Sequence, residues 1–192
     1  MKMYASLFSA MVLFLISCSP STQIAKSWKD PSVTAATVKP FKKVLVVAQL
    51  HDESTRRIAE DKFAAQFPAG VGVQSYGYLK PQDSAWSSVE QRLKNDGFDG
   101  VVSISLSNVD KSTSYVPGSS YGGWYGYRYS ASPGYYQEDK TYYVETNFYS
   151  LESGKLMWSG TTSTMNPSKV SKTIDDIIVA IKGQLQKEGL LK

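Results

Sequence analysis

Cys18 is the only cysteine in the chain, and it directly follows an apolar run near the N terminus. A thiolate is a nucleophile, and a lone cysteine has no second thiol in the chain with which to form a disulfide. The segment before it begins with the basic Lys2 and is apolar from Ala5 to Ile16, apart from two serines. We therefore interpret Cys18 as a thiol that is alkylated by a diacylglyceryl group, after which residues 1–17 are removed.

This N-terminal segment is typical of a secretory signal, because its apolar run is shorter than the about 20 residues that a membrane-spanning helix needs. The sequence Leu15-Ile16-Ser17-Cys18 resembles the lipobox of bacterial lipoproteins, and all four positions match. The resemblance implies palmitate on Cys18 and, because Ser19 rather than aspartate follows, an outer-membrane protein that faces the periplasm. An ordinary secretory signal or an N-terminal anchor helix remains the alternative.

Residues 112–138 form the segment with the most unusual composition, with seven tyrosines, Trp124, five glycines and two prolines, and Arg128 and Glu138 as its charges. Aromatic rings with polar tips provide rigid contact area, and such rings stack on sugars or lie in membrane interfaces. We expect partner or glycan contacts from Trp124, Tyr125, Tyr127 and Arg128. The alternative is a low-complexity insertion with no ligand.

The remaining polar residues give little evidence for a catalytic site. His51 is the sole histidine and follows a predicted strand next to Asp52 and Glu53, but a metal or an acid–base pair needs partners from elsewhere in the chain. We read these carboxylates as a helix cap and as partners of the helix dipole. The charged pairs Arg56–Glu60 and Arg57–Asp61 indicate a solvated helix face. No phosphate-binding or dinucleotide loop, zinc-ligand cluster or nucleophile elbow is present, so we predict a protein that is not an enzyme and needs no cofactor or metal.

The composition indicates a single folded domain. We divide the whole chain into three segments, of which the last is this domain. The formal charge of +4 is spread without a basic block, which argues against nucleic acid as a partner. Residues 1–17 are the signal peptide, 18–40 a polar tether behind the lipid, and 41–192 an α/β domain that contains the insertion 112–138. The predicted partners are the membrane, through the lipid on Cys18, and an unknown envelope protein or glycan.

Hydrophobic periodicity predicts the elements that position these residues. The run Val44–Ala48 is typical of a strand covered on both faces, and Ile174, Ile177 and Ile178 lie on one helical stripe. The element order is β-α-β-α-β-β-β-α, which predicts a mixed sheet of about five strands with helices packed against it. The expected ranges are strands 44–48, 71–75, 99–109, 141–151 and 155–164, and helices 52–67, 81–95 and 166–185.

This order resembles the small N-terminal α/β domains of TolB and of the curli-secretion lipoprotein CsgG. The chain is also similar to a group of uncharacterised bacterial lipoproteins, a resemblance that implies no assigned activity. It is carried by Trp28-Lys29-Asp30-Pro31, Lys43 to Val47, Arg56-Arg57 with Glu60-Asp61, Gly97 to Gly100, Tyr149 to Leu151 and Gly154 to Gly160. The sequence therefore predicts a lipid-anchored envelope module for binding or assembly, with carbohydrate or peptidoglycan binding through the aromatic segment as the alternative.

Overall fold

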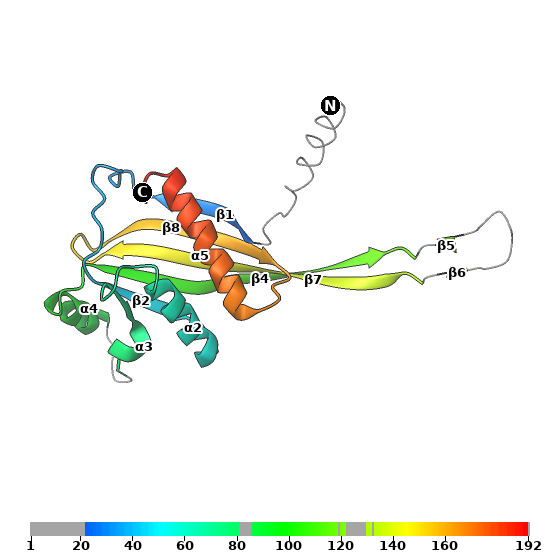
Figure 1. The fold of residues 1–192 in the computed structure, drawn as a ribbon, viewed down its shortest axis with the longest axis horizontal. Helices are drawn as coiled ribbons and strands as arrows, with labels where there is room; N and C mark the ends of the chain where they lie inside the picture. The colour runs from blue at the N-terminus through cyan, green and yellow to red at the C-terminus, as the bar shows by residue number, and fades with distance from the viewer. Residues whose placement is uncertain (1–21, 81–85, 119, 122–129, 132, 192) are drawn as a thin grey trace, which may run out of the picture.

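A computed structural model describes residues 22–80, 86–118, 120–121, 130–131 and 133–191 (Figure 1). In chain order the elements are β1 (Thr22–Lys29), β2 (Val44–Gln49), α2 (Glu53–Ala64), β3 (Gly72–Gln74), α3 (Ser75–Tyr78), α4 (Trp86–Asn95), β4 (Gly100–Val116), β5 (Ser120–Tyr121), β6 (Ser130–Ala131), β7 (Tyr135–Ser150), β8 (Lys155–Met165) and α5 (Val170–Lys187). Six strands form one mixed sheet in the order β1-β8-β7-β4-β2-β3. The predicted α/β fold with a mixed sheet is confirmed.

The parallel part of the sheet is built around β2, which contains the apolar run Val44–Ala48. β2 pairs in parallel with both β3 and β4, so it is a central strand, and its residues Val44, Leu45 and Val46 are fully buried. The helix α2 starts where Asp52 accepts a hydrogen bond from the Thr55 backbone N–H at 2.7 Å. Asp52 is the N-cap of α2, and its carboxylate accepts from a backbone N–H that has no acceptor within the helix.

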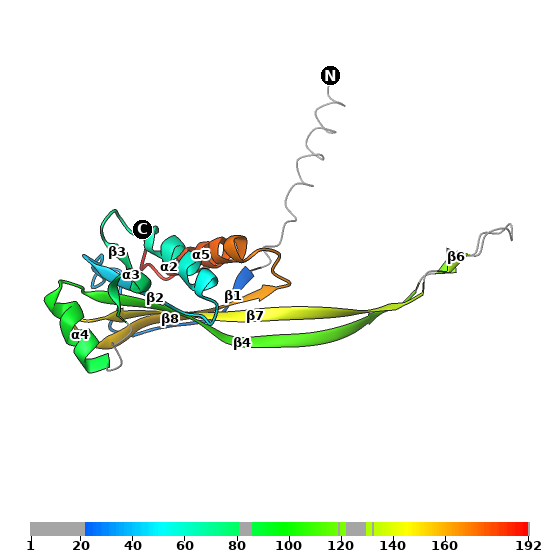
Figure 2. The same cartoon turned by 90° about the horizontal axis from the view of Figure 1, so that it is seen from below.

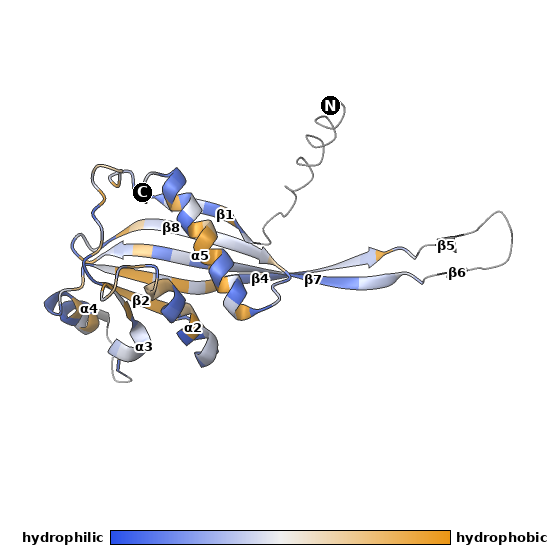
Figure 3. Ribbon diagram, viewed as in Figure 1, coloured by the Kyte–Doolittle hydropathy of each residue, from blue (hydrophilic) through white to orange (hydrophobic). Residues whose placement is uncertain are grey.

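Helices cover one face of the sheet along its length and the other face only at one end. On the first face α2 and α5 lie side by side, and Figure 2 shows both on the same side of the strands. On the opposite face, Val89 and Leu93 of α4 pack on Leu45 and Val101. Figure 3 shows that hydrophobic residues gather in the body under these helices. In the described part of the chain, no helix covers this second face over β7, β8 and β1, and we call that area the open face.

The stretch 18–40, which the sequence suggests is a polar tether, contains the sixth strand. β1 occupies Thr22–Lys29 and pairs antiparallel with β8 at the edge of the sheet. Its Lys26 and an irregularity between Ile24 and Lys26 are typical of an edge strand protected against further pairing. An edge strand with mostly exposed side chains shows little apolar alternation, which is why composition suggested a tether here.

Candidate functional surface

The strands β4 and β7 run far beyond the sheet and form a two-stranded arm. The last β2 residue, Gln49, pairs with Ser105, and the last β8 residue, Met165, pairs with Thr141. Beyond these points β4 and β7 pair with each other as far as Val116 and Tyr135, and Figures 1 and 2 show the ribbon leaving the body. We call residues 107–116 and 135–140 the arm.

Most side chains on both faces of the arm are polar or aromatic, with Val109 and Val116 as the aliphatic exceptions. Lys111 lies opposite Lys140 on one face, and Ser112 lies opposite Asp139 on the other. Near the far end the rings of Tyr115 and Tyr136 contact each other at 5.1 Å between centroids and are 57% and 76% exposed. A lone two-stranded ribbon is marginally stable in water, and each of its outer edges has unpaired backbone groups. The arm therefore contributes little to the core and presents surface to a partner.

Asn166 joins the root of the arm to the body. It adopts a left-handed backbone with φ 46°, and its side-chain oxygen accepts from the Lys140 backbone N–H at 2.8 Å. Its Nδ2 donates to Asp139 at 2.7 Å, and this hydrogen bond, with one from Gln137, lowers the pKa of Asp139. The sequence predicted a helix from residue 166, but α5 begins only at Val170, because Asn166 is engaged with the arm.

The predicted contact residues of the aromatic segment lie outside the described residues, as does the predicted lipidation site Cys18. What the structure describes of 112–138 differs from an irregular insertion. It contains the ends of β4 and β7 together with β5 and β6, which pair antiparallel through Ser120 and Ala131. The sequence did not predict these strands because a ribbon that is exposed to solvent on both faces needs no alternation of apolar and polar residues.

The open face displays two polar rows that cross neighbouring strands. Sheet register and the alternation of side chains place the residues of each row on the same face. The first row contains Gln49, Ser105, Glu145, Thr161 and Lys26. The second row contains Val47, Ser103, Asn147, Ser159 and Trp28.

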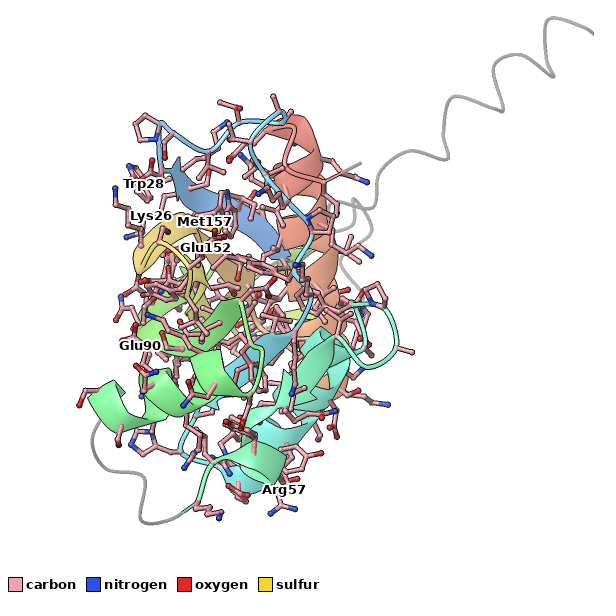
Figure 4. The ribbon with its side chains drawn as sticks, turned by 90° about the vertical axis from the view of Figure 1, so that its left-hand side faces the viewer. Lys26, Trp28, Arg57, Glu90, Glu152 and Met157 are labelled. Carbon is pink, nitrogen blue, oxygen red and sulfur yellow. The ribbon has the colours of Figure 1, made fainter. Side chains whose placement is uncertain are left out.

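These rows include polar groups whose hydrogen-bonding capacity is not used. Asn147 donates through Nδ2 to the Glu145 carboxylate at 2.8 Å, but its own Oδ1 and the Thr161 hydroxyl are buried without a partner among the described atoms. Such groups are uncommon in folded proteins, and each costs about 1–3 kcal/mol. Trp28 stands 48% exposed at the edge of the same face, and Figure 4 shows Trp28 and Lys26 on the side away from α5.

A shallow cavity of about 420 Å³ lies on the same side, between the sheet and α4. Val47, Val101 and Leu151 provide its apolar part, and Glu90 with Ser103 provides polar atoms. No described group of three histidine, cysteine, aspartate or glutamate side chains could hold a metal ion.

His51 is exposed in a bend after β2, and its neighbouring carboxylates serve the helix. Hydrogen bonds from Thr55 lower the pKa of Asp52, which caps α2 as the sequence predicted. Glu53 accepts hydrogen bonds from Arg57 Nε at 2.7 Å and from Arg56 Nη2 at 3.1 Å, and these hydrogen bonds lower the pKa of Glu53. The predicted pairs of these arginines with residues 60 and 61 are wrong, because Glu53 in the first turn takes both guanidinium groups.

Glu60 is the residue that sequence reasoning misplaced most. It was assigned to a solvated face, but it is fully buried. Its carboxylate accepts from the backbone N–H of Ala48 at 3.1 Å, from the Ser75 hydroxyl at 2.7 Å and from the backbone N–H of Tyr76 at 3.0 Å. Glu60 therefore joins α2 to the end of β2 and to the start of α3. The available signal was its position next to Ala59 and three residues before Phe63, on the apolar stripe of the helix.

No protein-family model matches this sequence, and no curated protein matches it either. The fold is loosely similar to a PelC dodecamer structure from Paraburkholderia phytofirmans, at 13% identity and a TM-score of 0.43, covering 89% of this chain and 99% of that chain. It is also loosely similar to lipoprotein GNA1162 from Neisseria meningitidis, at 16% identity and a TM-score of 0.40, covering 76% and 98%. At these scores the likenesses carry no conclusion about partners or activity. The resemblance to TolB and CsgG stays a prediction.

Taken by geometry alone, the described residues offer two surfaces for contact with another molecule. The arm presents free strand edges and exposed tyrosines, and the open face presents a polar floor bordered by Trp28 and Tyr149. Neither surface brings a nucleophile, a base that activates it and oxyanion donors to one point, which is what acyl-transfer catalysis needs.

Proposed function

We propose that this chain is a lipid-anchored envelope lipoprotein that acts as a non-enzymatic binding or assembly module. The anchor is Cys18, behind the signal-like segment 1–17, and the address is the periplasmic side of the outer membrane. In the described part of the chain no helix is long and apolar enough to cross a membrane. The observation that carries the binding role is the arm, in which β4 runs past the end of β2 and its last six residues, Lys111–Val116, run past the end of β8 as well.

The arm suits a partner that adds an extended segment to one of its edges. Backbone N–H and C=O groups along the outer edge of β4 beyond Ser105 and of β7 before Thr141 have no neighbouring strand in the described sheet. An added strand pairs with such an edge through main-chain hydrogen bonds, while side chains determine which partner fits. Tyr115, Tyr135 and Tyr136 provide the large contact area near the far end.

The anchor is tested by metabolic labelling. Palmitate label should enter the wild-type protein and be lost in Cys18→Ala, because the chain has no other thiol to receive a diacylglyceryl group. The variant should also leave the membrane fraction. Equal labelling of the two proteins would exclude Cys18 as the lipid site.

Shortening the arm tests the binding role. We expect that replacing residues 113–138 with Asn-Gly abolishes crosslinking to an envelope partner. The melting temperature should change little. Ser112 and Asp139 are directly paired, so a two-residue turn can join them, and the contact of Asp139 with Asn166 is kept.

The matched control keeps the arm at full length and changes Tyr115, Tyr135 and Tyr136 to serine. If strand edges dominate, this variant retains part of the crosslinking, and if the tyrosines dominate, it loses all of it. A shortened protein that crosslinks to the same discrete partner as the wild type would contradict the role of the arm.

Carbohydrate binding is the second candidate, and the open face favours it. Sugar hydroxyls need polar partners, which the half-buried Glu145 and Ser159 offer on this face, and a sugar ring stacks on an exposed aromatic side chain such as Trp28. Trp28→Ala should then weaken binding to purified sacculi, measured by sedimentation, at least about fivefold, since loss of one good stacking contact costs about 1–3 kcal/mol. The arm-shortened protein is the control and should sediment normally. Undiminished sedimentation of Trp28→Ala would remove the open face from this role.

A further inference from the structure

Asn166 covers the outer edge of β7 at the root of the arm. Its side-chain oxygen accepts from the Lys140 backbone N–H at 2.8 Å, and its own backbone N–H donates to the Lys140 carbonyl at 2.8 Å. Both backbone groups of Lys140 therefore point away from β4. In an antiparallel ladder, residues of this kind alternate along each strand with residues that bond across the ladder.

The same alternation determines which backbone groups of β4 are free. Lys111 is the direct partner of Lys140, and a directly opposed pair in which one residue bonds outward is a pair with no hydrogen bonds across the ladder. The N–H and C=O of Lys111 therefore also point outward. Every second residue of the strand shares this orientation, which adds Val109, Thr113 and Tyr115. Since β2 ends at Gln49 opposite Ser105, no described strand covers these groups.

The outer edge of β7 offers a shorter row of free backbone groups. Beyond Lys140, the residues of the arm with outward groups on this strand are Glu138 and Tyr136. An added strand makes main-chain hydrogen bonds to each outward-facing residue that it meets. The outer edge of β4, with four such residues in a row, is therefore the better edge for an added strand.

The side chains along this edge indicate the chemistry of the segment that fits it. Lys111 lies directly opposite Lys140, and like charges in this position repel each other. Glu138 binds Lys140 at 3.5 Å, whereas Lys111 has no carboxylate partner among the described residues. A residue that an added strand places directly beside Lys111 lies on the same side of the ribbon, so a carboxylate at that position offsets the repulsion.

We propose that the outer edge of β4, over residues 109–115, binds an extended segment of a partner protein that places an acidic side chain beside Lys111. This inference rests on the proposed binding role of the arm, and it names the edge and the partner's chemistry. Val109 and Tyr115 lie on the same side of the ribbon as Lys111. Apolar or aromatic side chains therefore suit the positions of the segment that flank its acidic residue.

Two synthetic peptides test the chemistry of the partner. Each alternates threonine with valine, a central test residue and tyrosine, and the test residue is glutamate in one peptide and lysine in the other. Fluorescence anisotropy measures their binding to the mature, lipidated protein in detergent micelles. The glutamate peptide should bind about two- to fivefold more tightly than the lysine peptide, which is what one exposed ion pair allows. Lys111→Glu should reverse this preference.

Two proline substitutions test the choice of edge. Thr113→Pro removes an outward N–H from β4, and Glu138→Pro removes one from its direct partner on β7, so neither change breaks a hydrogen bond across the ladder. Thr113→Pro should weaken binding of the glutamate peptide about fivefold or more, because a main-chain hydrogen bond is lost. Glu138→Pro should retain binding, since it leaves the edge of β4 intact and makes the arm more basic. Both variants should keep the wild-type melting temperature.

A larger loss of binding in Glu138→Pro than in Thr113→Pro would overturn the choice of edge. Equal affinity for the two peptides, or binding of neither, would overturn the acidic partner, and so would self-association of the protein that Thr113→Pro abolishes. The binding role of the arm fails by a different result, which is crosslinking of the arm-shortened protein to the same partner as the wild type.

Discussion

Glu60→Ala should lower the free energy of unfolding by about 3 kcal/mol. The carboxylate of Glu60 is fully buried and accepts three hydrogen bonds, from Ala48, Ser75 and Tyr76. Alanine leaves these donors buried or half-buried without an acceptor, and an unpaired buried donor costs more than its hydrogen bond contributes on average. Urea unfolding followed by far-UV circular dichroism measures the loss.

Two variants on the same helix separate this role from a general effect of removing charge. Glu53→Ala removes an exposed carboxylate that binds Arg56 and Arg57, and it should cost far less than Glu60→Ala, because surface ion pairs contribute little to stability. Glu60→Gln retains a single acceptor oxygen and should fall between alanine and wild type. Equal losses for Glu53→Ala and Glu60→Ala would show that Glu60 is not a buried connection.

Trp158→Ala is expected to cost about 4 kcal/mol, the largest loss of a single side chain in this domain. The Trp158 ring is 1% exposed, meets Phe148 edge to face at 5.6 Å between centroids, and lies over Gly160, where a β-carbon would collide with it. Truncation leaves a cavity in the core under α5. Thermal unfolding of the variant should show a melting temperature lowered by about 8–16 °C, at about 2–4 °C per kcal/mol.

Trp158→Phe retains much of this packing but loses the hydrogen bond from the indole Nε1 to Glu188 at 2.8 Å. Burial alone would raise the pKa of Glu188, but hydrogen bonds from Gln184, Ser27 and Trp158 outweigh it and lower that pKa below its ordinary value of 4.5. A lowered pKa in the folded state means that this stabilisation is complete above about pH 4.5 and is lost as the pH falls further. Trp158→Phe should therefore lose less stability than wild type between pH 5 and pH 3. Parallel loss in both proteins would contradict this contact.

The sequence predicted correctly those parts of the fold in which a periodic pattern of apolar residues packs on the core. Val44–Ala48 was assigned as a covered strand and is the centre of β2, and the isoleucines of 174–181 form the buried stripe of α5. The strand predicted at 99–109 was correct where β4 lies over the core. It continues to Val116, because the arm has no apolar face from which a strand could be read.

The candidate surface was less accessible to prediction, for a related reason. Ser103 and Asn147 belong to different strands, and only the sheet register places them side by side on the open face. The exposure of Trp28 depends on β1 lying at the edge of the sheet, which no local pattern indicates. Predicted contacts were therefore assigned to the residues of densest aromatic composition, around Trp124.

By itself the sequence predicted the N-terminal signal and showed its lone Cys18, the order of the strands and helices that pack on the core, and the absence of the familiar catalytic motifs, because each depends on neighbouring residues in the chain. Only the tertiary structure decided that β1 follows Cys18 after four positions, that β4 and β7 extend as an arm, and that Glu60 is buried. These features depend on contacts between segments far apart in sequence: β1 with β8, β4 with β7, and α2 with the start of α3. The arm and the buried Glu60 depend on these contacts. Hydrophobic periodicity reports only local burial, so it does not predict either feature.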